Sequence, residues 1–569
     1  AIGRLSMFVT TTGADNTAVG KSTMECNTTG ASNVAVGASA LFRNTTASCN
    51  TAVGVEALKA NTTSDNNTAF GYKALYTQVA DGARNTAIGL CALHGNTTGD
   101  DNVAVGYGAG DGNTTGSNNI SMGSGALDAN STGSHNVAIG NLALNDNTTA
   151  NSNVAIGTES LDVNTTGADN TAVGTNALGS NTTAANNVAI GSSSLTANTT
   201  GANNVAVGLS ALASNTTAAF NTAVGTCSGK TMTTGCHNTS LGAFSLFTST
   251  TGDNNVAIGL DALFCNNGSS ANNNTAVGHK AMCKNTTGAG NTAIGKQALL
   301  ANTTGDENAA VGIFALTTNT TAAKNAAMGY AALCSNTTGS CNTAFGTSAL
   351  EANTTASTNT AVGSFALRVN TTGQYNTAVG KDALDAVISG NYNTAVGLAA
   401  LGQATSSNNV AVGDRALDAV TSGANNIALG SESGAASNWL KWTTESNRLT
   451  LGNNDITNSY VKVDWTVGSD VRDKTNFGTI PHGLDFVNQL NPVSFQFKKS
   501  REDDTPHGNL RYGFKAQEIL ALEKANNGTN VIVDDEFEEH LNLTNSHLTP
   551  ILVKAIKELK AEIELLKKK

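Results

Sequence analysis

Residues Asn170 to Asn186 read NTAVGTNALGSNTTAAN, and close copies of this sequence fill most of the chain. Its opening pentapeptide, N-[TV]-A-[VI]-G with small variations, first occurs at Asn16 and last at Asn426. The pentapeptides recur at a step of 17 residues with three slips, and all three slips lie between pentapeptides. A fixed period is the sequence signature of a repeat architecture, in which insertions are confined to loops.

The full unit reads N-T-A-V-G-x-x-A-L-x-x-N-T-T-G-x-[DN]. Its two β-tending segments, one with Ala and Val and one with Ala and Leu, are separated by Gly and by Asn-Thr-Thr-Gly, whose residues favour turns and positive φ. Seventeen residues are too few for a pair of helices and suit one coil of a β-solenoid. Like side chains then stack in columns, so we expect an interior of Ala, Val and Leu and hydrogen-bonded columns of Asn and Thr.

One coil cannot be stable alone, because its four or so small apolar side chains do not offset an ordering entropy of ~1–2 kcal/mol per residue. Stability must therefore come from stacked coils and from neighbouring chains. About 26 coils at ~4.8 Å each predict a shaft roughly 120 Å long. The first residues fall inside a unit, so we also expect the chain to be a fragment of a longer polypeptide.

The composition excludes several classes of function. Charged residues make up 13% of the chain against the usual ~25%, so the surface must consist of uncharged Asn and Thr. The net charge of -11 argues against a nucleic-acid partner, and the lack of a ~20-residue apolar run argues against membrane insertion. Nine cysteines without a C-x-x-C pair suggest no zinc site or disulfide framework, and we expect most of them to fill the coil interior. No metal or other cofactor is predicted.

The C-terminal residues differ from the repeats, because the register ends after Asn447 and a globular composition follows. The alternation of Val461, Val463 and Trp465 predicts a short strand. Further patterns predict two strands and one helix, at Asn491–Lys499, Asn530–Val533 and Gly513–Ala525.

A long helix is predicted at the end of the chain, over residues 548–569. Its apolar residues follow a 4-3-4-3 spacing flanked by Lys and Glu, which is a heptad seam and predicts oligomerisation. The seam consists of Leu552, Ile556, Leu559, Ile563 and Leu566. Ile at a with Leu at d favours two strands by itself, so the seam does not set the number of chains.

The N-T-A-V-G-x-x-A-L units resemble the left-handed parallel β-roll of trimeric autotransporter adhesin heads and of related phage fibres, over about three quarters of the chain. This resemblance implies a mostly β fold, in which three identical chains form a parallel β-roll or β-solenoid of 17-residue coils. A small α+β domain with a C-terminal coiled-coil helix would follow it.

A second resemblance rests on three segments and the heptad helix. The segments are SDVRDK (Ser469–Lys474), LNPVSFQFK (Leu490–Lys498) and YGFKAQEI (Tyr512–Ile519). Together they are similar to the intramolecular-chaperone autoprotease domain of phage endosialidases and tail fibres. The resemblance implies a domain that trimerises, drives folding of the preceding fibre and then cuts itself off.

The residues for such a cut are present. A serine hydroxyl is a weak nucleophile until a base removes its proton, and a lysine can do so where its pKa is lowered. Lys474 lies five residues after Ser469 and can reach back after one tight turn. By the resemblance, Ser469 is the nucleophile, Lys474 is the general base and the cut falls beside Ser469, at the Ser469–Asp470 junction. Asp470 and Arg472 also match the family motif and orient the turn. Such an autoprotease acts once on its own chain, and no external substrate is predicted.

We therefore expect a repetitive β-solenoid shaft at residues 1–430, a β connector at 431–468 and an intramolecular chaperone at 469–569. The expected function is that of a structural and receptor-binding tail fibre in the virion of a virus, by resemblance a bacteriophage. The expected partners are two identical chains, upstream fibre or virion tail proteins, and a host cell-surface receptor, either glycan or protein.

Two other functions remain open at this point. A bacterial trimeric surface adhesin requires a membrane anchor, whereas this chain continues into a charged coiled coil. A glycan depolymerase on the β-solenoid requires two convergent carboxylates at ~5–9.5 Å. The acidic residues of the repeats stand mostly singly in loops, as at Glu56, Asp128 and Asp382, so their arrangement on the stacked coils discriminates this alternative.

Overall fold

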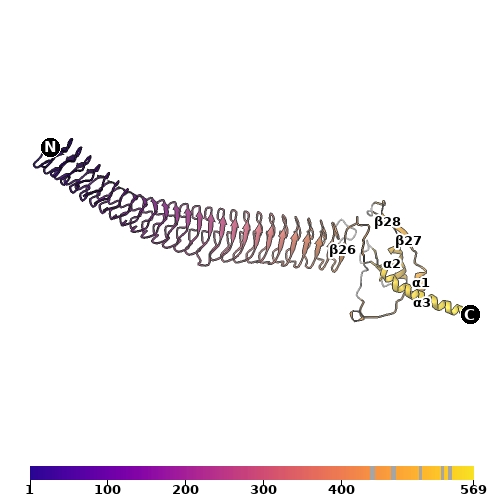
Figure 1. Ribbon diagram of the computed structural model, residues 1–569. Helices are drawn as coiled ribbons and strands as arrows, with labels where there is room; N and C mark the ends of the chain where they lie inside the picture. Colours follow the sequence, from indigo (N-terminus) through magenta and orange to yellow (C-terminus); the bar gives the residue numbers. More distant parts are fainter. Residues whose placement is uncertain (436–441, 463–468, 499–502, 527–530, 536–540) are drawn as a thin grey trace. The chain divides into compact units, whose positions relative to one another are not determined.

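The computed structural model of the chain describes residues 1–435, 442–462, 469–498, 503–526, 531–535 and 541–569. Contacts divide the chain into two compact units, Ala1–Asn376 and Thr377–Lys569. The first unit is a stack of β coils, and the second contains further coils followed by an α+β region (Figure 1).

Each coil contributes one strand of three residues. In the first unit the strands are β1 (Thr17–Val19), β2 (Val34–Val36), β3 (Thr51–Val53), β4 (Thr68–Phe70), β5 (Thr86–Ile88), β6 (Val103–Val105), β7 (Ile120–Met122), β8 (Val137–Ile139), β9 (Val154–Ile156), β10 (Thr171–Val173), β11 (Val188–Ile190), β12 (Val205–Val207), β13 (Thr222–Val224), β14 (Thr239–Leu241), β15 (Val256–Ile258), β16 (Thr275–Val277), β17 (Thr292–Ile294), β18 (Ala309–Val311), β19 (Ala326–Met328), β20 (Thr343–Phe345) and β21 (Thr360–Val362). In the second unit they are β22 (Thr377–Val379), β23 (Thr394–Val396), β24 (Val410–Val412), β25 (Ile427–Leu429) and β26 (Leu449–Leu451).

Neighbouring strands within each unit pair in parallel and in register. In β10 and β11, for example, Ala172 pairs with Ala189, its equivalent in the next coil. The same register joins β22 to β23 and β25 to β26, although the last step spans 22 residues. The predicted parallel β-solenoid of 17-residue coils is therefore confirmed.

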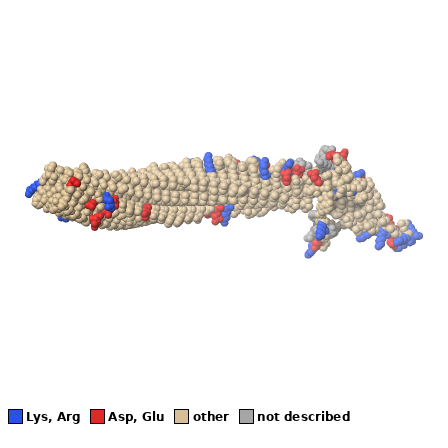
Figure 2. All heavy atoms as spheres, turned by 45° about the horizontal axis from the view of Figure 1, so that its top comes forward, with Lys and Arg blue, Asp and Glu red and all other residues tan. Residues whose placement is uncertain are grey.

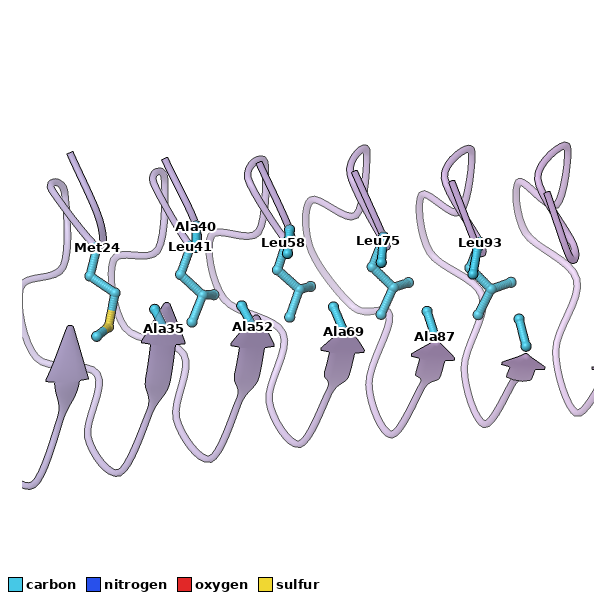
Figure 3. Packing of buried hydrophobic residues seen from close by; sticks show 14 of the residues in the cluster. Met24, Ala35, Ala40, Leu41, Ala52, Leu58, Ala69, Leu75, Ala87 and Leu93 are labelled. Atoms are coloured by element: carbon cyan, nitrogen blue, oxygen red, sulfur yellow. The ribbon is translucent and has the colours of Figure 1, made fainter. Parts of the chain in front are cut away.

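The coil interior is narrow and is filled by Ala and Leu. The central residue of each strand, such as Ala35 or Ala52, points inward and meets the Leu of the same coil, such as Leu41 or Leu58 (Figure 3). The prediction that Val joins this interior is wrong. In a three-residue strand the middle side chain points opposite to its neighbours, so inward Ala places the first and third residues outside.

The second segment of the unit does not form the strand that its Ala and Leu predict. In the coil that starts at Asn170, Gly174 has a φ of 135°, and Asn176 and Leu178 are left-handed with φ of 57° and 52°. Positive φ therefore falls on this second segment, which we call the left-handed arc, and on the residue before each pentapeptide. It does not fall on Asn-Thr-Thr-Gly. A left-handed Leu costs ~1–2 kcal/mol, and burial of its side chain, worth about 1.5–3 kcal/mol, offsets this cost.

Two columns of buried Asn run along the stack, which confirms the predicted hydrogen-bonded columns. In the first column, Asn187 donates its backbone N–H to Oδ1 of Asn170 at 3.0 Å. In the second, Asn198 Nδ2 donates to Oδ1 of Asn181 at 3.0 Å, and Asn181 Nδ2 donates to the Ala184 carbonyl at 3.0 Å. Since the amide nitrogen of an Asn-Thr-Thr triplet is used inside the stack, the triplets have a structural role in the folded chain.

The inserted residue before Asn85 is accommodated by a longer side chain in the second Asn column. Gln78 stands where most other coils have Asn. Its Oε1 accepts from Asn96 Nδ2 at 2.7 Å, and its Nε2 donates to the carbonyl of Gly82. The hydrogen bond to the following coil is therefore kept across the slip.

The second Asn column is broken at Met232, which has no amide to offer. Oδ1 of Asn215 in the preceding coil and Oγ of Ser249 in the following coil are buried without a hydrogen-bond partner. We expect Met232→Asn to raise the thermal midpoint, because the new amide can donate to Asn215 and accept from Ser249. Each buried polar atom left unpaired costs about 1–3 kcal/mol.

Thermal unfolding of this variant beside the wild type measures the effect. The matched control is Met282→Asn, which places the same amide in the apolar Leu column and should lower the midpoint. A midpoint that falls in both variants would show that the break at Met232 is not a weak point of the stack.

The cysteines do not fill the interior, so that prediction is wrong. Cys49 and Cys341 are exposed, and the other seven are only partly buried. The interior columns are occupied by the Ala and Leu of the strand and of the left-handed arc. The thiols consequently lie on the outer turns of the coils.

The α+β region of the second unit contains two antiparallel strand pairs, short helices and one long C-terminal helix. Its elements are η1 (Val471–Asp473), α1 (Leu484–Val487), β27 (Val493–Lys498), β28 (Pro506–Gly513), α2 (Ala516–Ala525), β29 (Val533–Asp534), β30 (Asn542–Leu543), η2 (Asn545–His547) and α3 (Leu548–Lys567). Strands β27 and β28 pair antiparallel, as do β29 and β30. A small core holds the helices together and consists of Phe486, Ile519, Ile532, Val533, Leu548 and Ile551. Among the described helices, none is long and apolar enough to cross a membrane.

The elements of this region agree with the sequence patterns to within a few residues. The strand predicted from Asn491 is β27, and the predicted terminal helix is α3. The helix predicted from Gly513 starts at Ala516, because Gly513 still pairs with Val493 in the hairpin. Of the strand predicted at Asn530–Val533, Val533 belongs to β29, Val531 and Ile532 do not, and Asn530 lies outside the described residues. The strand predicted around Val461 depends on Val463 and Trp465, which lie outside the described residues.

Candidate functional site

The segment from Ser469 to Lys474 forms a tight turn around η1. The Asp470 carboxylate caps this turn, since Oδ1 accepts from the backbone N–H of Arg472 at 2.9 Å. The guanidinium of Arg472 also donates to Asp470, with Nε 3.0 Å from each carboxylate oxygen. The two residues that sequence comparison assigns to the turn therefore contact each other and fix its shape.

The turn brings the two chemically important side chains together. Lys474 Nζ lies 2.7 Å from Ser469 Oγ and donates a hydrogen bond to it. This distance is within the range for proton transfer between a nucleophile and its base. When the amine is neutral, the same contact allows the hydroxyl to donate to Nζ instead.

Asp470 and Arg472, which lie beside this pair in the sequence, form an ion pair with each other. The Arg472 guanidinium holds the pKa of Asp470 below its usual range, and Asp470 in turn raises the pKa of Arg472. Asp470 is thus a charged structural group rather than a base. Ser469 and Lys474 are both exposed to solvent in the single chain. Both side chains are therefore accessible to another chain.

The same turn is where the similarity to known proteins begins. Residues 469–525 match the family model described as chaperone of endosialidase. This match contains the serine and lysine pair, the β27–β28 hairpin and α2, so the resemblance of the C-terminal segment is confirmed. A chaperone segment of this kind after a β-solenoid of 17-residue coils is consistent with a phage tail fibre. No curated protein is significantly similar to the chain.

Helix α3 exposes the predicted heptad seam. The helix packs Leu548, Ile551 and Ala555 into the core of its own chain. The seam lies on another face and remains 43–68% exposed at Leu552, Ile556, Leu559, Ile563 and Leu566. A row of five apolar side chains in water is unfavourable, so this face is complementary to another apolar surface.

The β27–β28 hairpin also presents apolar side chains to solvent. Phe497, Leu510 and Tyr512 are all largely exposed, and the ring of Phe497 lies under the guanidinium of Arg511 at 5.5 Å. The pairing of the two strands is irregular between Phe495 and Phe497. The hairpin is therefore a second surface of the region that is suited to contact other chains.

One important residue of this region is not identified by the sequence patterns. Glu523 is fully buried, and its carboxylate accepts backbone N–H groups of Val531, Ile532 and Val533 at 2.9–3.0 Å. The available signal is its position four residues after Ile519, on the apolar face of the predicted helix. Glu523 thereby joins α2 to β29.

The structure also brings together carboxylates that look isolated in the sequence. Asp111, Asp128, Asp146 and Asp162 occupy equivalent turns of successive coils. On the face that Figure 2 shows, most of the coil surface is uncharged and the charged side chains lie in a few small groups. Partial burial and the neighbouring carboxylates raise the pKa of Asp128 and of Asp162. Within the described residues, no group of three or more His, Cys, Asp or Glu has the geometry of a metal site.

This column of carboxylates makes the stability of the coils depend on pH. A pKa that is higher in the folded than in the unfolded chain favours folding below the unfolded pKa, and that contribution is lost as the pH rises through the folded pKa. We expect Asp128→Asn to raise the thermal midpoint by a few degrees at pH 7 and to change it little once the aspartates are protonated. Thermal unfolding from pH 3 to pH 7 measures this difference. Asp81→Asn, which changes an exposed aspartate outside this column, is the matched control, and equal effects of the two variants would contradict a role for the column.

Proposed function

We propose that the protein is the structural and receptor-binding tail fibre of a bacteriophage, built from three identical chains in the virion. Its C-terminal region, from residue 469, is an intramolecular chaperone that trimerises and folds the shaft. The observation that carries the proposal is the chaperone match, which starts at Ser469 and follows a β-solenoid. The chain attaches to upstream fibre or tail proteins and meets a glycan or protein receptor on the host cell surface.

The outer face of the coils supports association between identical chains. In every strand from β1 to β26, the third residue is Val, Ile, Leu, Met or Phe and points outward. No first or third residue of these strands is charged. Monomeric soluble proteins rarely expose continuous apolar patches larger than a few hundred Å². Second and third copies of the same shaft, with the same spacing of coils, cover such a face most completely.

The chemistry of self-cleavage follows from the 2.7 Å contact between Lys474 and Ser469. Once other chains cover the pair, neutral Lys474 accepts the proton of the serine hydroxyl as Oγ attacks a peptide carbonyl carbon. The proton then passes from Lys474 to the leaving amine, and the C–N bond breaks. The resulting ester is hydrolysed by water, which frees the chaperone and regenerates Ser469.

Two peptide bonds beside Ser469 are candidates for the cut. Attack of Oγ on the carbonyl of Ser469 itself, which opens the Ser469–Asp470 bond, closes a four-membered ring and is strained within one chain. Attack on the preceding carbonyl, which opens the Gly468–Ser469 bond, closes a five-membered ring. A serine from another copy can reach either bond. The masses of the released pieces differ by one serine residue and so identify the bond.

Release of the chaperone gives the fibre kinetic stability. A shaft that needs a template to assemble cannot easily refold once the template has left. The lifetime of the fibre is then set by its rate of unfolding rather than by a folding equilibrium. The experiment that tests the function compares the full chain with a chain that ends at residue 468. The full chain should yield a soluble fibre that migrates as an oligomer on unheated gels, whereas the shortened chain should aggregate. Equal assembly of both would refute the chaperone function.

A further inference from the structure

A pair of charged side chains on α3 lies next to the segment that follows the proposed cleavage site. Lys554 Nζ donates to the carbonyl of Ile480 at 2.7 Å and is 3.4 Å from that of Pro481. Glu558 Oε2 accepts the backbone N–H of Leu484 at 2.6 Å. The two side chains also pair with each other, with Nζ and Oε1 at 3.6 Å. Together they bind three backbone groups of a segment more than 70 residues away in sequence.

The segment from Ile480 to Leu484 is shaped to receive this pair. Gly483 lies directly against Glu558, and a Cβ at this position would overlap the carboxylate. Helix α1 has no side-chain cap of its own at Gly483, so Glu558 supplies an acceptor for its first N–H. His482 is buried and stacks on Phe486 with ring centroids 4.3 Å apart. The segment is therefore held by its backbone and by its side chains.

The geometry links α3 to the serine and lysine pair through a short tether. Ile480 lies six positions after Lys474 in the sequence, and a fully extended chain spans at most ~3.6 Å per residue. The turn that holds Ser469 must consequently stay within roughly 20 Å of the point where Lys554 binds Ile480. On the exposed face of the same helix lies the heptad seam, which we propose joins the three copies.

We propose that Lys554 and Glu558 are positioning residues for self-cleavage: they fix the segment after the cut site to the helix that assembles the trimer. This inference rests on the proposed function. When α3 associates, the clamp of Lys554 and Glu558 confines each Ser469–Lys474 turn near the assembled helices, where neighbouring chains can cover it. Without the clamp, the trimer forms but the turn samples a larger volume, so productive burial of Lys474 becomes rarer.

The test measures self-cleavage and oligomeric state of the full chain with Lys554→Met and Glu558→Gln. We expect both variants to form trimers and to be cut roughly tenfold to a hundredfold more slowly, since small displacements of reacting groups cost rate factors of this size. The matched controls are Lys557→Met and Glu562→Gln, two exposed charges on the same helix, and these should cut at the wild-type rate. Lys554→Arg can still donate to both carbonyls and should restore most of the rate.

A second measurement separates positioning from a general structural defect. In the uncut Ser469→Ala background, hydrogen exchange of the clamp variants should increase for residues 480–488 and stay unchanged in α2. Clamp variants that cut at the wild-type rate, or that lose the trimer as well, would overturn the inference. A wild-type chain that is never cut would instead refute the proposed self-cleavage, so the two failures can be told apart.

Discussion

Replacement of Ser469 by alanine is expected to leave the chain at its full length, while the wild-type chain is cut beside this residue. The reason is the 2.7 Å contact between Lys474 Nζ and Ser469 Oγ, because removal of Oγ removes the proposed nucleophile. In a serine protease, loss of the nucleophile lowers the rate roughly a millionfold, which for a single turnover amounts to no cut at all. Mass spectrometry of the purified chains measures the result directly.

Two further variants make the test of Ser469 specific. Lys474→Met should also block the cut, because the base is lost while the length of the side chain is kept. Ser546→Ala, a serine of η2, serves as the matched control and should be cut normally. If Ser469→Ala were shortened like the wild type, another agent would be responsible and the assignment of the serine and lysine pair would be wrong.

Charges in the heptad seam are expected to abolish assembly. The double change Ile556→Asp and Leu559→Asp puts two carboxylates on the exposed apolar face of α3 without touching the core residues Ile551 and Ala555. Burial of unpaired charges between helices costs several kcal/mol each, more than a seam of this length can offset. The chain should then remain monomeric, and the shaft should aggregate rather than fold.

The control for this prediction is Ala561→Asp on the same helix. Ala561 is exposed and lies outside the seam, so the added charge should leave the oligomer intact. Analytical ultracentrifugation of the soluble fraction distinguishes the variants. A double variant that sediments like the wild type would show that the seam does not hold the chains together.

The repetitive part of the fold is largely predictable from its sequence, because an error in one unit is corrected by its many copies. The period of 17 sets the parallel pairing of residues such as Ala172 and Ala189. The direction of Val and the path of the Ala-Leu segment are not predictable in the same way. In a three-residue strand, the alternation of apolar and polar side chains is too short to show which face is inside. Leucines such as Leu178 adopt a left-handed backbone conformation, which this residue type usually avoids.

The contacts of the candidate site are likewise only partly predictable from the sequence. The contact between Ser469 and Lys474 is predictable because the residues are five apart, so one turn brings them together. The clamp is not predictable, because Glu558 and Leu484 are separated by 74 residues and only the packing of α3 makes them neighbours. The column of aspartates is predictable only once the stacking of the coils is known, because its members then lie in equivalent turns.

The mass of the assembled particle shows whether three chains form one fibre. Native mass spectrometry of the uncut Ser469→Ala chain should give a single species of three times the 57.5 kDa chain mass. The same species should persist when the protein is diluted, because the shafts cover one another along their length. A folded, soluble particle with the mass of one chain would contradict the account.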